Sequence, residues 1–344
     1  MADYYFRLPQ ITELTISQQA ALNETKQIAL SGGPGTGKSV VSLWRHISNY
    51  QKSKKSLLLT FTTTLAKYLS ACCITQSSNA ASNVKTSLRG KPIMGSSWNE
   101  IIVDEAQDLP ISYYNDIKSI ANVSYGADDS QILYPDNCSK QSELKMLFGS
   151  NADYVLDKNF RSTQRIMQLA KTVFPNAYIP QSTIAGLAHN VGELPVFLIS
   201  NGSKYDKTNE KQNHSIIEII NSFRSDTHNI AILVPWKNDV GIFETVLKNN
   251  NIADFSIYYE DSVRFPLGCG DIKNVHITTF KSAKGLEFDT VIIPNFHKYK
   301  EICGSFNTEW QDYYVAVTRA RSNLYLISNN DMLQLNSVTD KSII

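Results

Sequence analysis

The amino-acid sequence predicts an α/β protein with parallel β-sheets in two domains. An apolar run at 28–30 ends in a glycine-rich turn that a helix follows, which is the order strand, loop, helix. Continuous apolar runs at 56–63 and 101–103 are typical of strands buried in a parallel sheet. Near residue 150 the alternation of strands and helices restarts. We therefore predict a first domain over 1–150 and a second over 151–344.

The composition is that of a soluble globular protein. Of the 344 residues 42% are hydrophobic and 19% charged, and the chain is long enough for two domains with separate cores. The net charge of +1 neither favours nor excludes a nucleic-acid partner. No apolar run approaches the ~18 residues that span a bilayer, and the start lacks the pattern of a signal peptide, so we expect a cytoplasmic protein without a membrane contact. The five cysteines are odd in number and form no C-x-x-C pair, which argues against a disulfide framework or a zinc site.

The first predicted elements flank the glycine-rich turn. A helix is expected over 14–22, capped by Thr15 or Ser17. The amide of Gln18 on this helix offers both a donor and an acceptor, which suits the edge of adenine. On its own, Gln18 would equally be a surface glutamine. The strand at 56–63 is followed by a further helix.

The glycine-rich turn matches the G-x-x-x-x-G-K-[ST] pattern of a phosphate-binding loop. In that pattern backbone N–H groups surround a polyphosphate, the lysine reaches the β- and γ-phosphates, and the hydroxyl binds Mg²⁺. Glycine lets the backbone approach phosphate closely, and the helix N-terminus adds a partial positive charge. A Rossmann dinucleotide turn fits less well, because it needs no Lys-Ser pair. The predicted phosphate-loop residues are Gly32, Gly33, Pro34, Gly35, Thr36, Gly37, Lys38 and Ser39.

Acidic residues follow the strand at 101–103. In phosphate-loop NTPases an aspartate at such a strand end holds Mg²⁺ together with the loop hydroxyl, which predicts Asp104 and Ser39 as metal ligands. The neighbouring Glu105 could polarise the attacking water. Two adjacent carboxylates after a strand would otherwise form only a turn, but the phosphate loop seventy residues earlier favours the metal site.

Other polar residues could reach a nucleotide bound at this loop. Gln131 stands where a strand that begins near Val123 leaves the sheet, and it could bond the γ-phosphate or the water. Its alternative is an ordinary polar turn. Arg161, Lys284 and Arg319 are cations that the second domain could present to the nucleotide, although each alone is usually a solvated surface charge.

The second domain shows a similar alternation. Strands are expected at 194–199, 229–234 and 255–259, with amphipathic helices near 215–223 and 241–249. This pattern predicts a second parallel α/β domain, which has no Gly-Lys-Ser loop of its own.

In order and spacing, these stretches resemble the motif series of the UvrD/Rep-like branch of superfamily 1 helicases. The resemblance runs from Leu14 to Leu324 and implies two RecA-like motor domains with the ATP site in the cleft between them. Gln18 falls where that family reads adenine, and Glu287 falls in a stretch where a glutamate approaches the ribose. The residues to which the resemblance gives catalytic roles are Glu105 as base, Lys38, Gln131, and Arg161 and Arg319 as two arginine fingers.

The resemblance also implies contacts with single-stranded DNA. The run Thr60-Phe61-Thr62 is similar to a motif whose backbone and aromatic ring contact the strand, and neighbours of Glu287 grip DNA in the family. Lys281 stands where a histidine is usual. The nucleic-acid-binding residues predicted in this way are Thr60, Phe61, Thr62, Tyr134, Lys281 and Lys284.

The chain departs from the family pattern in two ways. Only 70–99 and 260–274 are left for the two large insertions of the family, so we expect a compact motor without most of the accessory domains. The family's aromatic-arginine pair falls on Asp136 and Asn137, which leaves Tyr134 as the nearby aromatic residue.

The function implied by the resemblance is that of an ATP-driven translocase or helicase on single-stranded DNA. Its cofactors are ATP and Mg²⁺, and its movement is 3′→5′. An alternative is a DNA-sensing ATPase switch that regulates a protein partner, such as a nuclease in a repair or phage-defence complex. A third hypothesis is that the partner is RNA and not DNA, because contacts with the nucleic-acid backbone and stacking on bases tolerate either sugar.

Overall fold

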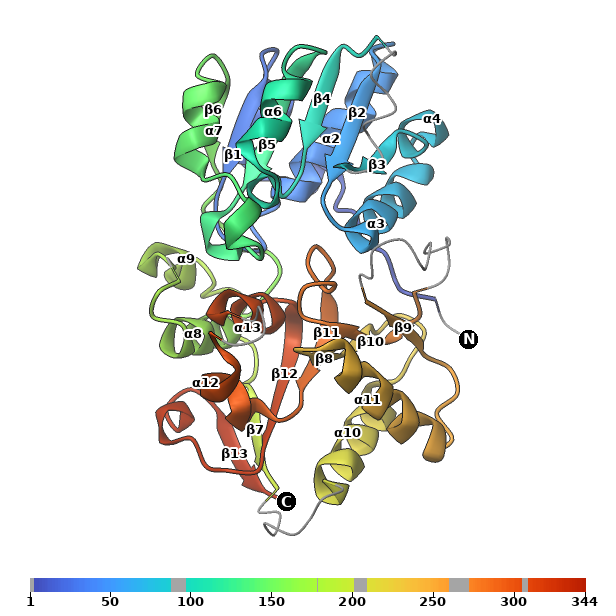
Figure 1. Cartoon of the computed structure of the whole chain (residues 1–344), viewed down its shortest axis with the longest axis vertical. Helices are drawn as coiled ribbons and strands as arrows, with labels where there is room; N and C mark the ends of the chain where they lie inside the picture. Colours follow the sequence, from blue (N-terminus) through green and yellow to red (C-terminus); the bar gives the residue numbers. More distant parts are fainter. Residues whose placement is uncertain (1–2, 88–96, 178, 201–208, 260–271, 305–308) are drawn as a thin grey trace. The chain divides into compact units, whose positions relative to one another are not determined.

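The computed structural model describes residues 3–87, 97–177, 179–200, 209–259, 272–304 and 309–344. The chain forms two compact units, Phe6–Phe160 and Met1–Tyr5 with Arg161–Ile344, and each is an α/β domain with its own sheet (Figure 1). None of the helices in the described ranges combines the length and the apolar composition needed to cross a lipid bilayer.

The first unit contains a six-stranded sheet in the order β3-β2-β4-β5-β1-β6, and every pair of neighbours is parallel. The strands are β1 (Ile28–Ser31), β2 (Ser56–Thr60), β3 (Val84–Thr86), β4 (Glu100–Val103), β5 (Asn122–Ala127) and β6 (Ala152–Val155). Because β4, β5 and β1 are neighbours and parallel, the loops that follow them start at the same edge of the sheet.

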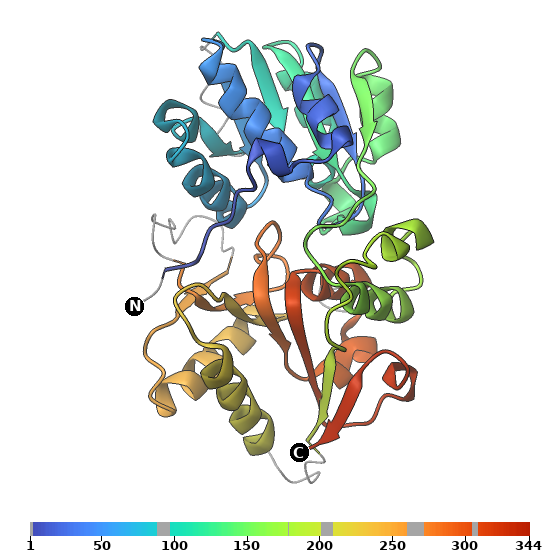
Figure 2. The ribbon, with the colours of Figure 1, turned by 180° about the vertical axis from the view of Figure 1, so that it is seen from behind.

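Helices cover both faces of this sheet. They are α1 (Ile16–Asn23), α2 (Lys38–Gln51), α3 (Thr63–Ile74), α4 (Ser78–Ala81), α6 (Ile111–Ile117) and α7 (Gln141–Leu147). In Figure 1, α6 and α7 lie in front of the strands, and Figure 2 shows α1 and α2 on the opposite face. Tyr114 of α6 and Leu144 of α7 are fully buried in one core, whereas Ala21 and Val41 pack with Ile28 in the other.

The second unit contains a seven-stranded parallel sheet in the order β13-β7-β12-β11-β8-β10-β9. Its strands are β7 (Val196–Ile199), β8 (Ile230–Val234), β9 (Ser256–Tyr258), β10 (Val275–Thr279), β11 (Phe288–Ile293), β12 (Ala320–Ser328) and β13 (Asp340–Ile343). Its helices are α8 (Gln164–Val173), α9 (Gln181–Ala185), α10 (Glu210–Phe223), α11 (Lys237–Asn249), α12 (Tyr299–Ile302) and α13 (Trp310–Val317).

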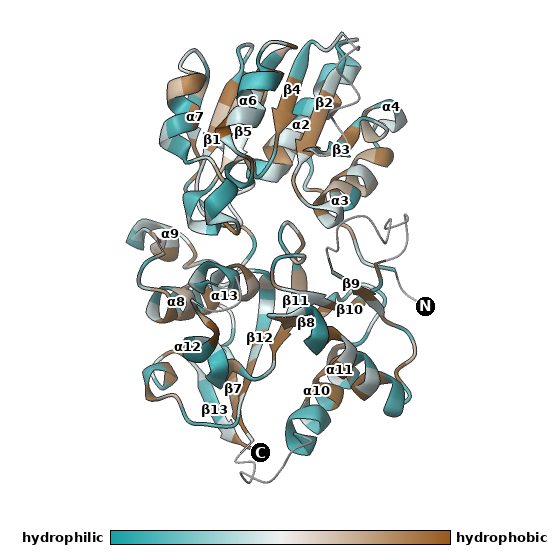
Figure 3. Ribbon diagram, in the orientation of Figure 1, coloured by the Kyte–Doolittle hydropathy of each residue, from teal (hydrophilic) through white to brown (hydrophobic). Residues whose placement is uncertain are grey.

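Apolar strands and helix faces form the core of the second unit. Isoleucines of α10 and Phe243 of α11 pack against alternate residues of β8 and β10. The rings of Phe174, Tyr299 and Tyr313 form part of a separate aromatic cluster that joins α8, α12 and α13. Figure 3 shows the hydrophobic residues gathered on central strands such as β2, β4 and β11.

The predicted strands and helices of both domains are present, but the division between the units lies elsewhere. The apolar run at 154–156 reads as the start of the second domain, whereas β6 pairs with β1 in the first sheet. The first unit therefore extends to Phe160 rather than to residue 150, and the segment Met1–Tyr5 belongs to the second unit. The two stretches assigned to family insertions lie partly outside the described residues.

Candidate nucleotide-binding site

The phosphate loop connects β1 to α2, and two of its glycines have φ angles that favour glycine. Gly32 and Gly37 have φ angles of 140° and 88°, which residues with a side chain rarely adopt. A Cβ atom on Gly32 would lie 2.1 Å from the carbonyl oxygen of Leu156, and one on Gly37 would lie 2.3 Å from Nε2 of Gln18. By contrast, a Cβ on Gly33 would meet no atom within 4 Å.

Lys38 and Gln18 are both bonded to the loop. Nζ of Lys38 donates to the carbonyl oxygens of Gly32 at 2.6 Å and Gly33 at 3.0 Å, and it lies 3.8 Å from a carboxylate oxygen of Asp128. Nε2 of Gln18 donates to the carbonyl oxygen of Thr36 at 2.9 Å. The structure thus brings the predicted adenine-reading glutamine and the predicted phosphate-binding lysine to one loop.

The carboxylate of Asp104 lies close to Lys38. A Cβ atom on Gly126, in the adjacent strand β5, would lie 3.5 Å from Oδ1 of Asp104 and 3.5 Å from Cβ of Lys38. Both groups, a buried carboxylate and the phosphate-binding lysine, therefore border the same residue of β5. Oxygen ligands of this kind fit Mg²⁺, and the half-buried Ser39 follows Lys38 in the first turn of α2. If Mg²⁺ binds here, Asp104 and Ser39 would hold it, and the ion would neutralise phosphate charge.

A chain of buried polar side chains continues from this point. Nε2 of Gln107 donates to Glu105 at 2.7 Å, and Oε1 of Gln107 accepts from the backbone N–H of Asp128 at 3.1 Å. Nε2 of Gln131 donates to the carboxylate of the same residue, Asp128, at 2.6 Å from Oδ2. Each of these side chains is buried. Gln107 and Gly126 were not predicted as site residues, although Gln107 lies within the acidic run that followed β4.

Glu105, the predicted base, has a strained backbone. Its φ of 55° and ψ of 47° place a residue that carries a side chain in the left-handed region. Such conformations cost roughly 1–3 kcal/mol and persist where the surroundings enforce them, often at functional sites. The bond from Gln107 further restrains the carboxylate.

In the second unit, Glu287 is bonded to two arginines. Its carboxylate accepts from Nε of Arg161 at 3.2 Å and from Nη1 of Arg321 at 2.5 Å. Burial tends to raise the pKa of Glu287, but the two guanidinium groups outweigh it and hold that pKa below its usual value. The structure therefore brings two predicted site residues, Arg161 and Glu287, together, and it adds Arg321, which was not predicted.

Arg319, the second predicted arginine finger, is buried near the same place. Its guanidinium donates to the carbonyl oxygen of Val315 at 3.1 Å and to that of Leu286, the residue before Glu287, at 3.4 Å. Only 1% of Arg319 is exposed. Its role as a finger stays a prediction.

Of the predicted nucleic-acid-binding residues, two aromatic rings of the first unit are in contact. The ring centroids of Phe61 and Tyr134 are 5.1 Å apart with an interplanar angle of 48°. Thr60 ends β2, and the hydroxyl of Thr62 caps α3 by accepting from the N–H of Leu65. Both threonine side chains are buried.

The two predicted lysines of the second unit differ in exposure. Nζ of Lys281 lies 3.8 Å from Asp312, whose pKa burial raises to about 6 although Lys281 opposes the rise. The side chain of Lys281 is 24% exposed, whereas Lys284 is fully buried. A contact of Lys284 with nucleic acid stays a prediction that would require this residue to become accessible.

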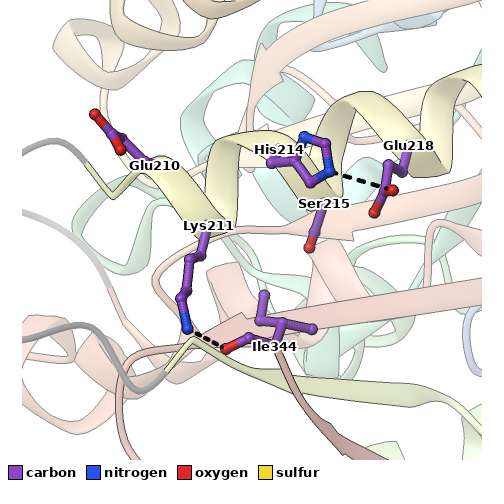
Figure 4. Close-up of a pocket in the computed structure, with 6 residues that line it drawn as sticks. All are labelled: Glu210, Lys211, His214, Ser215, Glu218 and Ile344. Atoms are coloured by element: carbon purple, nitrogen blue, oxygen red, sulfur yellow. Dashed lines mark hydrogen bonds and ion pairs between the residues drawn. The ribbon is translucent and has the colours of Figure 1, made fainter.

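A pocket of about 300 Å³ lies in the second unit. Figure 4 shows it along α10, where Lys211 donates to the carbonyl oxygen of Ile344 at 3.0 Å and His214 lies 3.2 Å from Glu218. Its lining contains none of the predicted site residues.

Comparison with known proteins gives one family model and two curated relatives. A model described as the UvrD-like helicase C-terminal domain matches residues 267–331. A protein of Acanthamoeba polyphaga mimivirus named as an ATP-dependent DNA helicase is 26% identical over 247 residues, which is 66% of this chain and 34% of the relative. A probable DNA helicase of Mycoplasma pneumoniae is 24% identical over 246 residues, which is 66% of this chain and 43% of the relative. The chain thus spans less than half the length of these relatives.

Solved helicase structures show weaker likeness. The helicase of PRRSV is 15% identical with a TM-score of 0.47, covering 93% of this chain and 55% of that one. An arterivirus helicase, nonstructural protein 10, in complex with DNA is 13% identical with a TM-score of 0.45, covering 94% and 66%. Both TM-scores lie below 0.5, and the two parallel sheets of this chain are defined by their own strand orders.

The family model matches the segment that carries Lys281, Glu287 and Arg319, and both curated relatives are named as DNA helicases. These findings agree with the motif series that runs through both units. Over residues 267–331 the chain is similar to the UvrD-like helicase C-terminal domain, and over 66% of its length it is similar to proteins named as DNA helicases.

Proposed function

We propose that this protein is an ATP-dependent translocase on single-stranded DNA, with 3′→5′ movement and a capacity to separate duplex DNA. The observation that carries the proposal is the buried polar chain from Glu105 through Gln107 to Asp128, which ends at the lysine of the phosphate loop. A carboxylate fixed within hydrogen-bonding distance of groups at a phosphate site is suited to orient a water for attack.

The roles of the chain's residues in hydrolysis follow from this arrangement. Lys38 and the loop N–H groups bind the phosphates, Gln18 contacts the base, and Glu105 takes the proton of the attacking water. We propose that Gln131, which donates to Asp128, bonds the γ-phosphate or that water. We propose that Arg161 and Arg319 of the second unit stabilise charge that develops on the transferred phosphoryl group.

The contact of Phe61 with Tyr134 supports a nucleic-acid partner. Both rings are partly exposed, and aromatic rings are platforms on which bases of a single strand stack. Stacking of this kind tolerates any sequence, as a translocase requires. Lys281 would add a contact to the strand.

Steady-state ATP hydrolysis with and without single-stranded DNA tests the proposal, with Lys38→Ala as the blank. We expect strong stimulation by DNA and no hydrolysis by the variant. Hydrolysis by wild type equal to the blank in both conditions would contradict an ATPase. Low hydrolysis that DNA does not stimulate would instead favour the switch that awaits a protein partner, and equal stimulation by RNA would remove the preference for DNA.

Polarity and unwinding need a separate assay. Partial duplexes with a 3′ or a 5′ single-stranded tail distinguish the two directions, because a translocase loads on the tail. We expect strand separation only with the 3′ tail. Separation from the 5′ tail alone would overturn the proposed direction without touching the ATPase.

A further inference from the structure

The N-terminal segment Asp3–Tyr5 belongs to the second unit, although it is far in sequence from the strands of that unit. The backbone N–H of Tyr4 donates to the carbonyl oxygen of Ile272 at 2.9 Å. The side chain of Asn229 clamps the next residue, because its Oδ1 accepts from the N–H of Tyr5 at 2.8 Å and its Nδ2 donates to the Tyr5 carbonyl at 2.9 Å. The segment is therefore held on both sides by the unit that contains Glu287.

Within this segment, Tyr4 is directed into the interior. Only 2% of the residue is exposed, and its ring packs edge-on against Phe288 with centroids 5.7 Å apart. Its hydroxyl donates to the carbonyl oxygen of Glu287 and accepts from the N–H of Glu287 at 3.2 Å. One hydroxyl thus bonds both backbone groups of a single residue that is 283 positions away.

The backbone of Glu287 lies at a place where regular structure does not supply such bonds. Glu287 lies two residues after Gly285, whose φ is 85°, and directly before Phe288, the first residue of β11. Buried peptide groups outside helices and strands need partners from elsewhere, and Tyr4 is that partner here. At the other end of the side chain, Arg161 and Arg321 hold the two carboxylate oxygens.

We infer that Tyr4 is a positioning residue for Glu287: its hydroxyl fixes the backbone from which the carboxylate is directed to the ribose of ATP. The inference rests on the proposed function and on the ribose contact that the resemblance to superfamily 1 helicases implies for Glu287. Tyr4 itself touches neither the nucleotide nor the reacting atoms. It acts through the peptide groups of Glu287.

Two nucleotides and two variants test this role. Tyr4→Phe removes only the hydroxyl and keeps the ring against Phe288, while Tyr5→Phe is the matched control because it removes a hydroxyl from the neighbouring residue, which is 44% exposed. We expect Tyr4→Phe to raise the KM for ATP about three- to tenfold, as the loss of one or two hydrogen bonds implies, with kcat within about twofold of wild type. With 2′,3′-dideoxy-ATP, which lacks the ribose hydroxyls, the variant and wild type should have the same KM.

The pattern separates positioning from a general structural effect. An equal rise of KM with both nucleotides, or an unchanged KM for ATP, would overturn the inference while leaving the ATPase in place. The same rise in Tyr5→Phe would overturn it as well.

Amide hydrogen exchange supplies a readout that does not depend on hydrolysis. In Tyr4→Phe the N–H of Glu287 loses its acceptor, so its exchange should accelerate at least about tenfold, and Tyr5→Phe should leave it unchanged. If wild type fails to hydrolyse ATP, the proposed function fails, and unchanged exchange at Glu287 would show separately that Tyr4 does not fix this backbone.

Discussion

Two adjacent glycines of the phosphate loop, Gly32 and Gly33, differ in the space available for an added Cβ atom. At Gly32 a methyl group would overlap the carbonyl oxygen of Leu156, whereas at Gly33 it would point into open space. We expect Gly32→Ala to lower ATP affinity at least about tenfold and to destabilise the first unit by roughly 1–3 kcal/mol. Gly33→Ala should change stability by no more than about 0.5 kcal/mol.

Nucleotide titration and thermal unfolding of both variants measure these effects. Because Gly33 has no positive φ, its alanine variant is a control for the added methyl group alone. Equal affinities of the two variants for ATP would contradict the steric argument.

Glu105 permits a second test at the level of one residue. Glu105→Gln keeps an oxygen that can accept from Gln107 but removes the basic carboxylate. We expect the hydrolysis rate to fall about 10²- to 10⁴-fold with ATP affinity within about threefold of wild type. A single-turnover assay with bound ATP measures the rate directly, and a variant as fast as wild type would show that another group takes the proton.

At the scale of elements, a buried ion pair ties α2 to β4. Glu100 accepts from Nε of Arg45 at 2.8 Å and from Asn49 at 2.7 Å, and it also accepts from the hydroxyl of Ser124. Arg45 is only 6% exposed. Glu100→Ala would leave its guanidinium buried beside the sheet without that charge partner, which costs about 3–5 kcal/mol.

An exposed ion pair in the same unit is the matched comparison. Lys145 of α7 lies 2.5 Å from Asp153 of β6, with side chains 45% and 47% exposed. Because solvent screens such pairs, Asp153→Ala should cost at most about 1 kcal/mol. Chemical denaturation of both variants gives the two free energies, and similar losses would mean that burial does not set the strength of these pairs.

The sequence predicted most elements of the fold, because apolar runs and capping residues are local signals. Thr15, one of two candidates, caps α1, and the loop between β1 and α2 lies where the glycine pattern predicted it. The assignment of β6 depended on pairing with β1, which no local pattern reveals. For the same reason Tyr4 was missed, since its partner Glu287 lies at the far end of the chain.

In the candidate site, too, local sequence signals could be interpreted but contacts between distant residues could not. Residues in contiguous motifs, such as Lys38 and Asp104, could be named from spacing. Arg321 joins the site only because the fold brings it to Glu287, 34 residues away in the sequence. A pattern along the chain contains no information on contacts of this kind.

At the scale of the whole molecule, each unit contains a buried histidine. His46, in the first unit, bonds Ser56 and the carbonyl oxygen of Ala80, and His276, in the second, bonds Ser256 and stacks on Phe288. Burial lowers the pKa of each to about 4 from the usual 6.5, although hydrogen bonds, and Glu100 in the case of His46, oppose the change. Both rings are therefore neutral in the folded protein at pH 7.

Acid should consequently destabilise both units. Between pH 6.5 and 4 the unfolded chain binds protons at these histidines that the folded chain does not, so the free energy of unfolding falls as the pH is lowered through this range. The full loss, reached below about pH 4, is roughly 3 kcal/mol for each histidine.

Hydrogen exchange of β2, which adjoins His46, and of β10, which contains His276, measures the two units separately at pH 7 and pH 5. His214→Gln is the control, because the side chain of His214 is 74% exposed, and its profile should match wild type. Equal stability at the two pH values in either unit would mean that its buried histidine titrates normally and that burial does not exclude the proton.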